Sequence, residues 1–319
     1  MRNNLYIQQV LRWSSQHSAL IILILLFMYG ALGLPNFLTE LNLSAIFYQY
    51  SVIGLLALGQ LLVILTGGID LSQGAVVALT SITTATVMRS HGLLPGILGG
   101  IVLATCMGVC SGLLVARTNM PPFLVTLGML GVSRGLAMQI ANAKPVPINI
   151  TSFNAFGQSS IFGIPTSTFI WAAACISIYY FLSRRRLGRY IYAVGSHAEN
   201  SRLSGINIGV VKLMVYTLSA FFTSIGGVIW TSRLGSGSPV GGVNYELESI
   251  AAVVVGGGNL FGGEGSIFGM VTGVLIFGVI NSVLNLLWIS PFWQGMIKGM
   301  LVLLVVALSQ LRRAGRNER

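Results

Sequence analysis

Long apolar runs, separated by short polar or glycine-rich segments, fill most of the chain. A helix needs about 20 mostly apolar residues to cross the hydrocarbon core of a bilayer. About ten runs approach or reach this length, at residues 18–34, 45–65, 71–88, 93–116, 123–141, 166–183, 210–231, 246–262, 266–287 and 292–310. The pattern predicts an all-α fold, a polytopic bundle of about ten transmembrane helices that makes residues 1–319 a single domain.

One polar stretch, residues 184–209, interrupts this pattern. It opens on three consecutive arginines from Arg184, and Gly195 and Gly205 limit any helices within it. Apolar residues recur in it at mostly helical spacing, namely Ile191, Val194, Ala198, Leu203 and Ile206. The spacing predicts a short amphipathic helix at about Ala198–Ser204, lying on one face of the membrane.

Composition agrees with a membrane protein, because 54% of the residues are hydrophobic, only 8% are charged and the mean hydropathy is +0.82. A soluble domain carries about 25% charged residues. The net charge of +11 would suit nucleic acid, but the basic residues gather in segments that one side of a bilayer would receive. This placement predicts a chain embedded in the lipid bilayer, with no nucleic-acid partner.

The distribution of lysine and arginine also predicts the orientation of the bundle. With the N-terminus in the cytoplasm, thirteen of the 18 basic residues fall in cytoplasmic segments. The segments expected outside carry only Arg89, Lys144 and Arg233. An even number of spans then returns the C-terminus to the cytoplasm, so both termini are expected on that side.

Two basic residues, Arg134 and Lys298, lie within predicted spans. Each must snorkel to the interface, pair with another group or face water. The candidate partners are Asp70, Glu246 and backbone carbonyl groups, and the sequence does not choose among them. A role in lining a cavity or joining helices stays open beside snorkelling.

No arrangement of residues in the sequence suits catalysis or metal binding. The three cysteines, Cys106, Cys110 and Cys175, lie within apolar runs, and the three histidines are scattered. A nucleotide-binding P-loop needs Gly-Lys followed by Ser or Thr, and the sequence contains no Gly-Lys pair. The sequence therefore predicts a chain that is not an enzyme, with no catalytic residue, no metal site and no cofactor of its own.

Four motifs together carry a resemblance to a known family. Besides the polar stretch they are T-G-G-I-D-L-S at Thr66–Ser72, P-P-F-L-V-T-L-G at Pro121–Gly128 and G-G-G-N-L-F-G-G-E-G-S at Gly256–Ser266. From about Ser51 to Arg313 the chain resembles the permease subunits of bacterial ATP-binding-cassette importers, in the branch for ribose and other simple sugars. The polar stretch resembles the coupling loop that such subunits present to their ATPase.

This resemblance implies a multi-pass permease subunit of the bacterial inner membrane that moves a small, ribose-like sugar by alternating access. ATP and Mg would bind to a separate cytoplasmic ATPase, and a periplasmic sugar-binding protein would deliver the sugar. A second permease copy or a paralogue would complete a dimeric pore. The residues that this resemblance assigns to ATPase coupling are Ala198, Glu199, Arg202, Leu203, Gly205 and Ile206. The plain alternative is a basic loop that only sets topology.

A neutral sugar needs amide, hydroxyl and aromatic side chains along its path rather than paired charges. The residues that could line such a path are Tyr48, Gln60, Thr126, Arg134, Asn281 and Asn285. Asp70 and Glu264 each follow a glycine pair at a predicted span boundary. A carboxylate in that position caps the free N–H groups of a helix, or it lies beside the pore.

A second class of function stays open, an ion-coupled secondary transporter of a small polar solute. Such proteins place ion sites at broken helices near the bilayer midplane. Asp70 is the candidate acid nearest the membrane interior. An ATPase partner would favour the importer, whereas proton-driven uptake by the protein alone would favour the secondary transporter.

Overall fold

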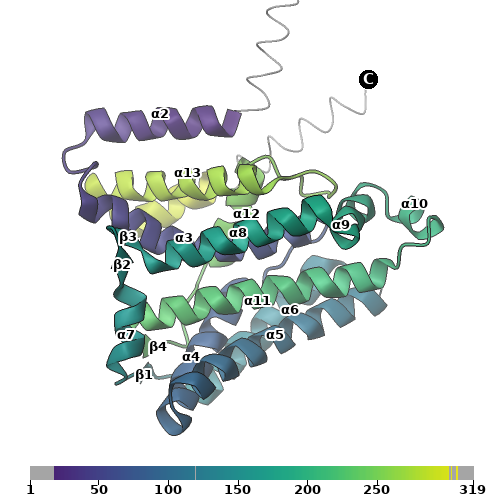
Figure 1. Ribbon diagram of the computed structural model, residues 1–319, viewed down its shortest axis with the longest axis horizontal. Helices are drawn as coiled ribbons and strands as arrows, with labels where there is room; N and C mark the ends of the chain where they lie inside the picture. The colour runs from purple at the N-terminus through teal and green to yellow at the C-terminus, as the bar shows by residue number, and fades with distance from the viewer. Residues whose placement is uncertain (1–17, 119, 302, 304–306, 308–319) are drawn as a thin grey trace, which may run out of the picture.

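The computed structural model describes residues 18–118, 120–301, 303 and 307. Its helices are α2 (Ser18–Gly33), α3 (Glu40–Leu65), α4 (Gln73–His91), α5 (Leu93–Arg117), α6 (Pro122–Ala141), α7 (Thr151–Gln158), α8 (Thr166–Arg184), α9 (Arg186–Ser196), α10 (Ala198–Leu203), α11 (Ile208–Leu234), α12 (Tyr245–Val255) and α13 (Ile267–Leu286). Residues 291–301 are helical as well. The long helices lie side by side in one bundle (Figure 1), which confirms the predicted all-α fold.

Two short antiparallel strand pairs lie at the end of the bundle that also carries α7 (Figure 1). The strand β1 (Val146–Pro147) pairs with β4 (Ser236–Gly237), and β2 (Ser160–Ile161) pairs with β3 (Ile164–Pro165). The helices α9 and α10 lie at the opposite end. The two ends of the bundle are therefore built differently, one from strands and a short helix, the other from the α9–α10 segment.

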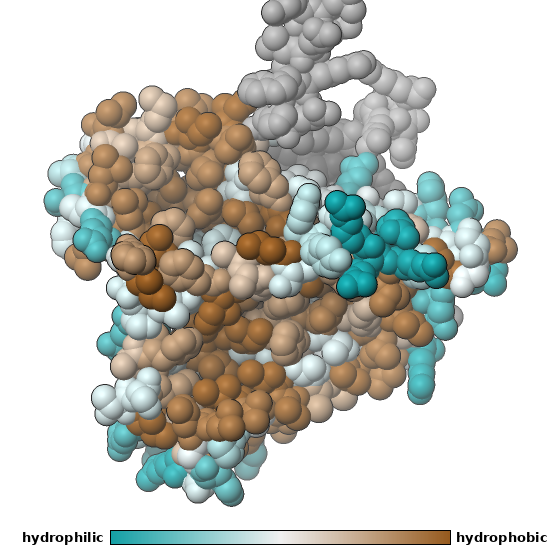
Figure 2. Space-filling view, in the orientation of Figure 1, coloured by the Kyte–Doolittle hydropathy of each residue, from teal (hydrophilic) through white to brown (hydrophobic). Residues whose placement is uncertain are grey.

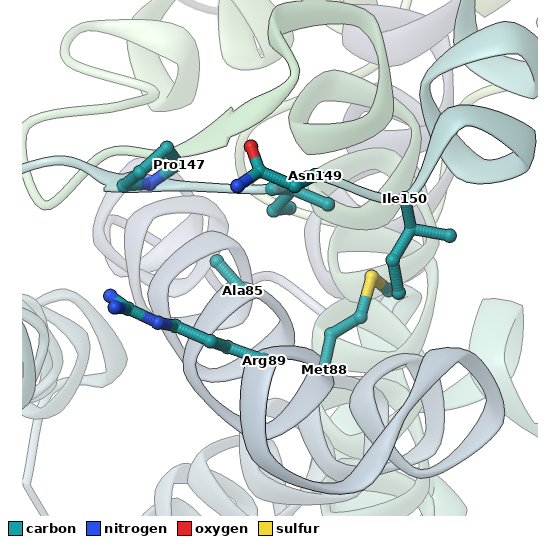
Figure 3. Close-up of a pocket in the computed structure, with 7 residues that line it drawn as sticks. Ala85, Met88, Arg89, Pro147, Asn149 and Ile150 are labelled. Carbon is teal, nitrogen blue, oxygen red and sulfur yellow. The ribbon is translucent and has the colours of Figure 1, made fainter.

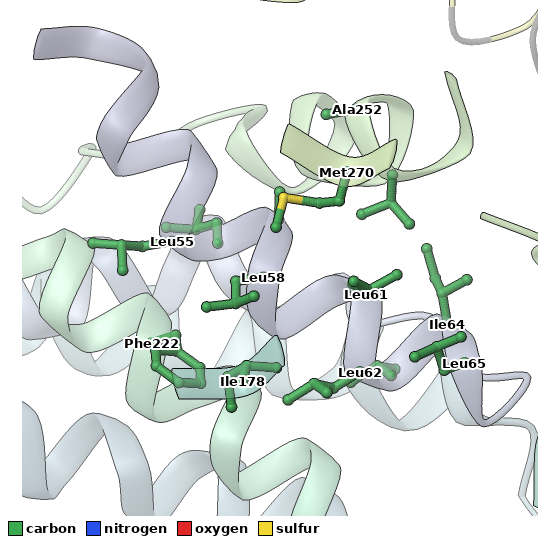
Figure 4. Packing of buried hydrophobic residues seen from close by; sticks show 14 of the residues in the cluster. Leu55, Leu58, Leu61, Leu62, Ile64, Leu65, Ile178, Phe222, Ala252 and Met270 are labelled. Carbon is green, nitrogen blue, oxygen red and sulfur yellow. The ribbon is translucent and has the colours of Figure 1, made fainter. Parts of the chain in front are cut away.

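The helix α3 forms the centre of the bundle. In its most apolar 18-residue window 89% of the residues are buried, against 28% in each of α5, α6 and α8. A helix that is apolar on every side is expected in the interior. Leucines of α3 pack against Ile178 of α8, Phe222 of α11 and Met270 of α13 (Figure 4). The core is thus arranged around one helix, and the outer helices leave apolar faces exposed.

Six helices of the described chain are long and apolar enough to cross a membrane: α3, α5, α6, α8, α11 and α13. The helix α2 is apolar but has 16 residues, and α4 has 19 residues that include many Thr and Ser. The tenth predicted span can be followed only to residue 301. The segments whose cytoplasmic location was predicted at the two termini, 1–17 and 308–319, lie outside the described residues.

The helix at the predicted span 246–262 is shorter than predicted. This helix, α12, stops at Val255 and has 11 residues, a length of about 16 Å that covers half of the hydrocarbon core. Three consecutive glycines follow, and Gly257 has a φ of +91°, which an L-residue rarely adopts. The glycines therefore end the helix inside the apolar run, and a loop leads on to α13.

Glycine spacing allows close helix contacts at some of the positions where the sequence pairs glycines four apart. A Cβ added at Gly269 or Gly273 of α13 would meet the backbone of Gly256 or Ala252. Comparable contacts are made by Gly96, Gly100, Gly108 and Gly112 of α5. Among the described residues, nothing lies within 4 Å of a Cβ added at Gly131, Gly135, Gly295 or Gly299. These last four glycines leave open surface on the chain.

Polar and apolar surfaces separate along the bundle. On the face shown in Figure 2, hydrophilic residues gather at the α9–α10 end and at the end with α7 and the strands, and hydrophobic residues cover most of the surface between them. An exposed apolar band of this size is typical of a surface in contact with a membrane. Together with the six apolar helices, this band makes the chain a multi-pass membrane protein.

Candidate functional site

The helix α10 stands away from the rest of the bundle (Figure 1). It lies at the position predicted for the short amphipathic helix, and Leu203 at its end is 73% exposed. Gly205 follows with a φ of +80° and its N–H donates to the carbonyl of Arg202 (3.0 Å), which closes the helix end. Ile206 is half-buried and its N–H donates to the carbonyl of Ser201 (3.0 Å). The result is a small helical projection with an exposed apolar tip.

The charged residues of α10 pair with each other. Arg202 Nη2 lies 2.6 Å from Glu199 Oε1, and Arg202 Nε donates to Glu199 Oε2 at 3.0 Å. Hydrogen bonding to Arg202 lowers the pKa of the Glu199 carboxyl, so the pair is ionised at neutral pH. Exposed pairs of this kind contribute little to stability. They leave both side chains on the surface, where another protein can bind them.

The preceding helix α9 anchors this projection to the bundle. Its apolar side chains Ile191 and Val194 are buried in the main core, at 0% and 3% exposure. On the same helix the hydroxyl of Tyr192 donates to the carbonyl of Gly265 (3.0 Å), which lies in the loop between α12 and α13. Movement of α9 is therefore tied directly to that loop.

Three chain segments meet at the end of α9 through bare backbone, and we call this contact the glycine junction. It comprises Leu65, Gly195, Gly262 and Gly263. The N–H of Gly263 donates to the carbonyl of Leu65 (3.0 Å), and a Cβ added at Gly195 would meet both groups. A Cβ added at Gly262 would meet the backbone of Gly195. The sequence pattern predicts Gly195 only as a helix-limiting residue and carries no signal for this contact.

The loop between α3 and α4 holds Asp70 in the interior, at 2% exposure. Asp70 Oδ1 accepts hydrogen bonds from the N–H (3.0 Å) and hydroxyl (2.6 Å) of Ser72, which directly precedes α4. Asp70 Oδ2 accepts from the hydroxyl of Ser219 in α11 (2.8 Å). Both carboxylate oxygens are thus occupied by protein donors, and they join the loop to α11.

Two further predicted residues contact the same loop. The side-chain amide of Gln60 is assigned so that its nitrogen and oxygen both face matching partners. Its nitrogen then donates to the backbone carbonyl of Asp70 (3.1 Å), and its oxygen accepts from the backbone N–H of Asp70 (3.2 Å). The hydroxyl of Thr126 in α6 donates to the carbonyl of Ile69 (3.0 Å). Asp70, Gln60 and Thr126, which are far apart in sequence, therefore meet around one buried loop.

The other predicted path residues lie apart from this group. Tyr48 donates to the carbonyl of Ser159 (3.4 Å), and Asn281 Nδ2 donates to Gln49 Oε1 (3.2 Å). Asn285 Oδ1 accepts from Gln294 Nε2 (2.9 Å). These side chains bond to neighbouring protein groups at separate places along the bundle.

The two basic residues within predicted spans have different partners. Arg134 Nη1 donates to two backbone carbonyls, those of Pro239 and Gly241, each at 2.9 Å. Backbone carbonyls were among the predicted partners. Lys298 Nζ instead lies 2.8 Å from Glu248 Oε1, a partner that the sequence analysis did not consider. This pair could not be predicted from the sequence, because its two residues are 50 positions apart and meet only in the folded chain.

Glu264 lies in the loop between α12 and α13, where its backbone carbonyl accepts from the N–H of Asn259 (2.9 Å). The side-chain oxygen of Ser266, directly before α13, accepts from the N–H of Gly269 (3.0 Å).

Within the described part of the chain no three His, Cys, Asp or Glu residues gather closely enough to hold a metal ion.

A hollow of about 260 Å³ opens at the end of the bundle opposite α10. Ala85, Met88 and Arg89 of α4 form one wall, and residues 147–150 form the other (Figure 3). None of the residues predicted for coupling or for the sugar path lines it.

Comparison with known proteins gives a consistent result. Residues 42–306 match the family described as branched-chain amino acid transport system / permease component. The chain is 38% identical to the ribose import permease protein of Escherichia coli over 306 residues, which are 94% of this chain and 95% of the relative. It is 39% identical to the ribose import permease protein of Bacillus subtilis over 284 residues, 88% of each chain. It is 35% identical to the D-allose transport system permease protein of Escherichia coli over 301 residues, 94% of this chain and 92% of the relative. No solved structure matches the chain.

Proposed function

Because the chain belongs to the branched-chain amino acid transport system / permease component family, we propose that it is the pore-forming subunit of an ATP-binding-cassette importer for a small, ribose-like sugar. The names of the relatives, which import ribose or allose, support the sugar assignment. The subunit lies in the bacterial inner membrane with both termini in the cytoplasm. In this proposal α2, α4, α12 and the helix from residue 291 add four membrane segments to the six apolar helices, which gives ten.

The partners follow from the same premise. A cytoplasmic ATPase binds ATP and Mg, and a periplasmic binding protein supplies the sugar. A second copy of the permease, or a paralogue, completes the pore. The ATPase contacts α10 through the coupling residues, which are Ala198, Glu199, Arg202, Leu203, Gly205 and Ile206.

The observation that carries the coupling proposal is the glycine junction beneath α10. A force on α10 reaches α9, whose end contacts Leu65 at the end of α3 and Gly263 in the α12–α13 loop. Because these contacts are made between backbones, no side chain can rearrange to absorb the movement. ATP binding would therefore displace the loops that follow α3 and α12 and switch the pore between its outward- and inward-facing states.

The loop that follows α3 has the polar groups that a neutral ligand requires. Asp70, Gln60 and Thr126 meet there, and we propose that their neighbourhood borders the sugar path when the loop moves. Arg134, Asn281 and Asn285 would line other depths of the same path, whereas Tyr48, whose ring lies under the guanidinium of Arg233, is placed outside it. Asp70 and Glu264 hold the loops on which this movement acts.

The deciding experiment replaces Ala198–Ser204 with a Gly/Ser segment of equal length in cells that express the complete importer. ATP-dependent sugar uptake should fall to background while the permease stays inserted at normal abundance. Normal uptake by this variant would contradict the coupling role. Proton-driven uptake by the purified permease without an ATPase would instead establish an ion-coupled secondary transporter.

A further inference from the structure

A second hollow, of about 410 Å³, opens at the end of the bundle opposite α10. Its lining comes from three helices and comprises Leu41, Ser44, Ala45, Tyr48, Gln158 and Arg233. The first four belong to the start of α3, Gln158 ends α7 and Arg233 is the second-last residue of α11. The hollow thus lies where the start of α3 and the ends of α7 and α11 meet.

Among the described residues, the arginine of this hollow makes no ion pair. The guanidinium of Arg233 lies over the ring of Tyr48, 5.2 Å from the ring centroid. Within the described part of the chain, no carboxylate lies within 4.0 Å of Arg233, since the ion pairs there are Arg202–Glu199 and Lys298–Glu248. The aromatic face holds the cation in place but leaves its N–H groups without an anionic acceptor.

The lengths of the helices place the hollow at the depth of lipid headgroups. The 26 residues of α3 span about 39 Å and the 27 residues of α11 about 40 Å, against about 30 Å for the hydrocarbon core. Each helix therefore extends several ångströms beyond the core at its ends. Leu41 and Arg233 both lie within two residues of such an end.

The surroundings of the hollow are apolar and exposed. Leu41 is 83% exposed and Phe162, in the neighbouring strand turn, is 99% exposed. Leu38 and Leu234 are exposed as well. A sugar would need several polar groups along such walls, whereas an amphiphile needs one charged contact beside apolar surface. The combination of an unpaired arginine and an apolar rim fits a lipid better than a sugar.

We propose that this hollow binds the phosphate group of an anionic phospholipid. The planar guanidinium of Arg233 is suited to bind two phosphate oxygens. The amide nitrogen of Gln158 donates to the backbone carbonyl of Arg233 (3.5 Å), and its second N–H is a further donor beside the guanidinium. The acyl chains then run over Leu41 and Ala45 towards the membrane interior. This site goes beyond the transport function and does not depend on it, because it requires only that the bundle sits in a bilayer.

The test measures lipid binding by the purified full-length protein in neutral detergent, using native mass spectrometry. Phosphatidylglycerol and phosphatidylcholine with the same acyl chains are supplied at equal concentration. Phosphatidylglycerol should bind roughly tenfold tighter, and Arg233→Gln should remove this preference. The matched control is Arg89→Gln, in the other hollow at the same end of the bundle, which should retain the preference (Figure 3).

A second variant tests the site independently in case Arg233→Gln does not fold. Leu41→Asp adds a negative charge at an exposed residue of the rim, so it should fold normally and still exclude phosphatidylglycerol. Equal binding of both lipids by the unaltered protein, or loss of the preference in Arg89→Gln as well, would overturn the site. Displacement of phosphatidylglycerol by an equal concentration of inorganic phosphate would show that a free anion is the ligand and would overturn the lipid assignment. Selective binding of acidic peptides with no lipid preference would do the same.

Discussion

The helix α10 and the glycine junction beneath it are separated by only a few residues, yet they are built in opposite ways. The surface of α10 consists of exposed side chains, with an ion pair and the apolar Leu203 at its tip. The glycine junction is made mainly by backbone, because Gly195, Gly262 and Gly263 approach closely and only the hydroxyl of Ser196 lies beside them. The surface of α10 is suited to contact another protein. The glycine junction is suited to pass a displacement of α9 on to the neighbouring segments.

This comparison predicts that the two regions fail differently when mutated. A change on α10 should spare the fold and remove coupling, whereas a change in the glycine junction should damage the fold itself. Mutations that separate these two outcomes test the comparison directly.

The largest effect on stability is expected from Gly195→Ala. The new Cβ would overlap the carbonyl of Leu65 and the N–H of Gly263, and backbone cannot move aside as a side chain can. Overpacking of this kind costs about 1–3 kcal/mol, so the unfolding temperature in detergent should fall clearly. The control is Gly131→Ala, where nothing described lies within 4 Å of the added Cβ, and its unfolding temperature should not fall. Equal behaviour of the two variants would contradict the close packing of the glycine junction.

The next effect concerns transport rather than stability. Leu203→Asp replaces the exposed apolar tip of α10 with a charge, which should abolish sugar uptake and leave the unfolding temperature unchanged. Leu203→Met keeps an apolar side chain of similar volume and should retain most of the uptake. Uptake assays paired with thermal unfolding of the purified permease separate the two effects. If Leu203→Asp transported normally, α10 could not be the contact with the ATPase.

A smaller change is expected from Tyr192→Phe, which removes the hydrogen bond to the carbonyl of Gly265. Stability should fall by about 1 kcal/mol, the usual contribution of one such bond. Because the bond ties α9 to the α12–α13 loop, fewer sugars should be moved for each ATP hydrolysed. Measuring uptake and ATP hydrolysis in the same vesicles gives this ratio. An unchanged ratio would restrict Tyr192 to a structural role.

The smallest effect is expected from Glu199→Gln. The ion pair with Arg202 is fully exposed, so its loss should not measurably change the unfolding temperature at neutral pH. The pKa of Glu199 is lowered in the folded chain, so any contribution is present above the ordinary carboxyl pKa and is lost as the pH falls through the lowered value. Thermal unfolding curves of the unaltered protein and of Glu199→Gln should therefore coincide. At neutral pH the exposed pair contributes too little to be measured, and at acidic pH its contribution is lost. A clear difference at neutral pH would show that α10 depends on this pair for its structure.

The apolar pattern predicted the long helices well, because a membrane-spanning helix needs a continuous apolar run and little else. The predicted spans 93–116, 123–141 and 166–183 differ from α5, α6 and α8 by one residue at one end. The same reasoning overestimated the length of the helix at 246–262, where hydropathy continues through glycines that end the helix at Val255. Hydropathy measures the solvent that a segment prefers, and it does not report backbone conformation.

The candidate site was predictable only in part, because its local and long-range features differ in origin. The position of α10 follows from apolar spacing within one short segment. The glycine junction joins residues 65, 195 and 262–263, and the ion pair of Lys298 with Glu248 joins two other distant segments. A single sequence carries no signal for such contacts, since each glycine in it is equally consistent with a turn, a helix end or a close approach.

The central claim is that α10 faces the cytoplasm, where an ATPase can bind it. It is tested most directly by replacing Cys106, Cys110 and Cys175 with serine and introducing Glu199→Cys as the single cysteine. A membrane-impermeant maleimide should label this cysteine only after the cells are opened. Labelling in intact cells would place α10 on the outer surface and contradict the account.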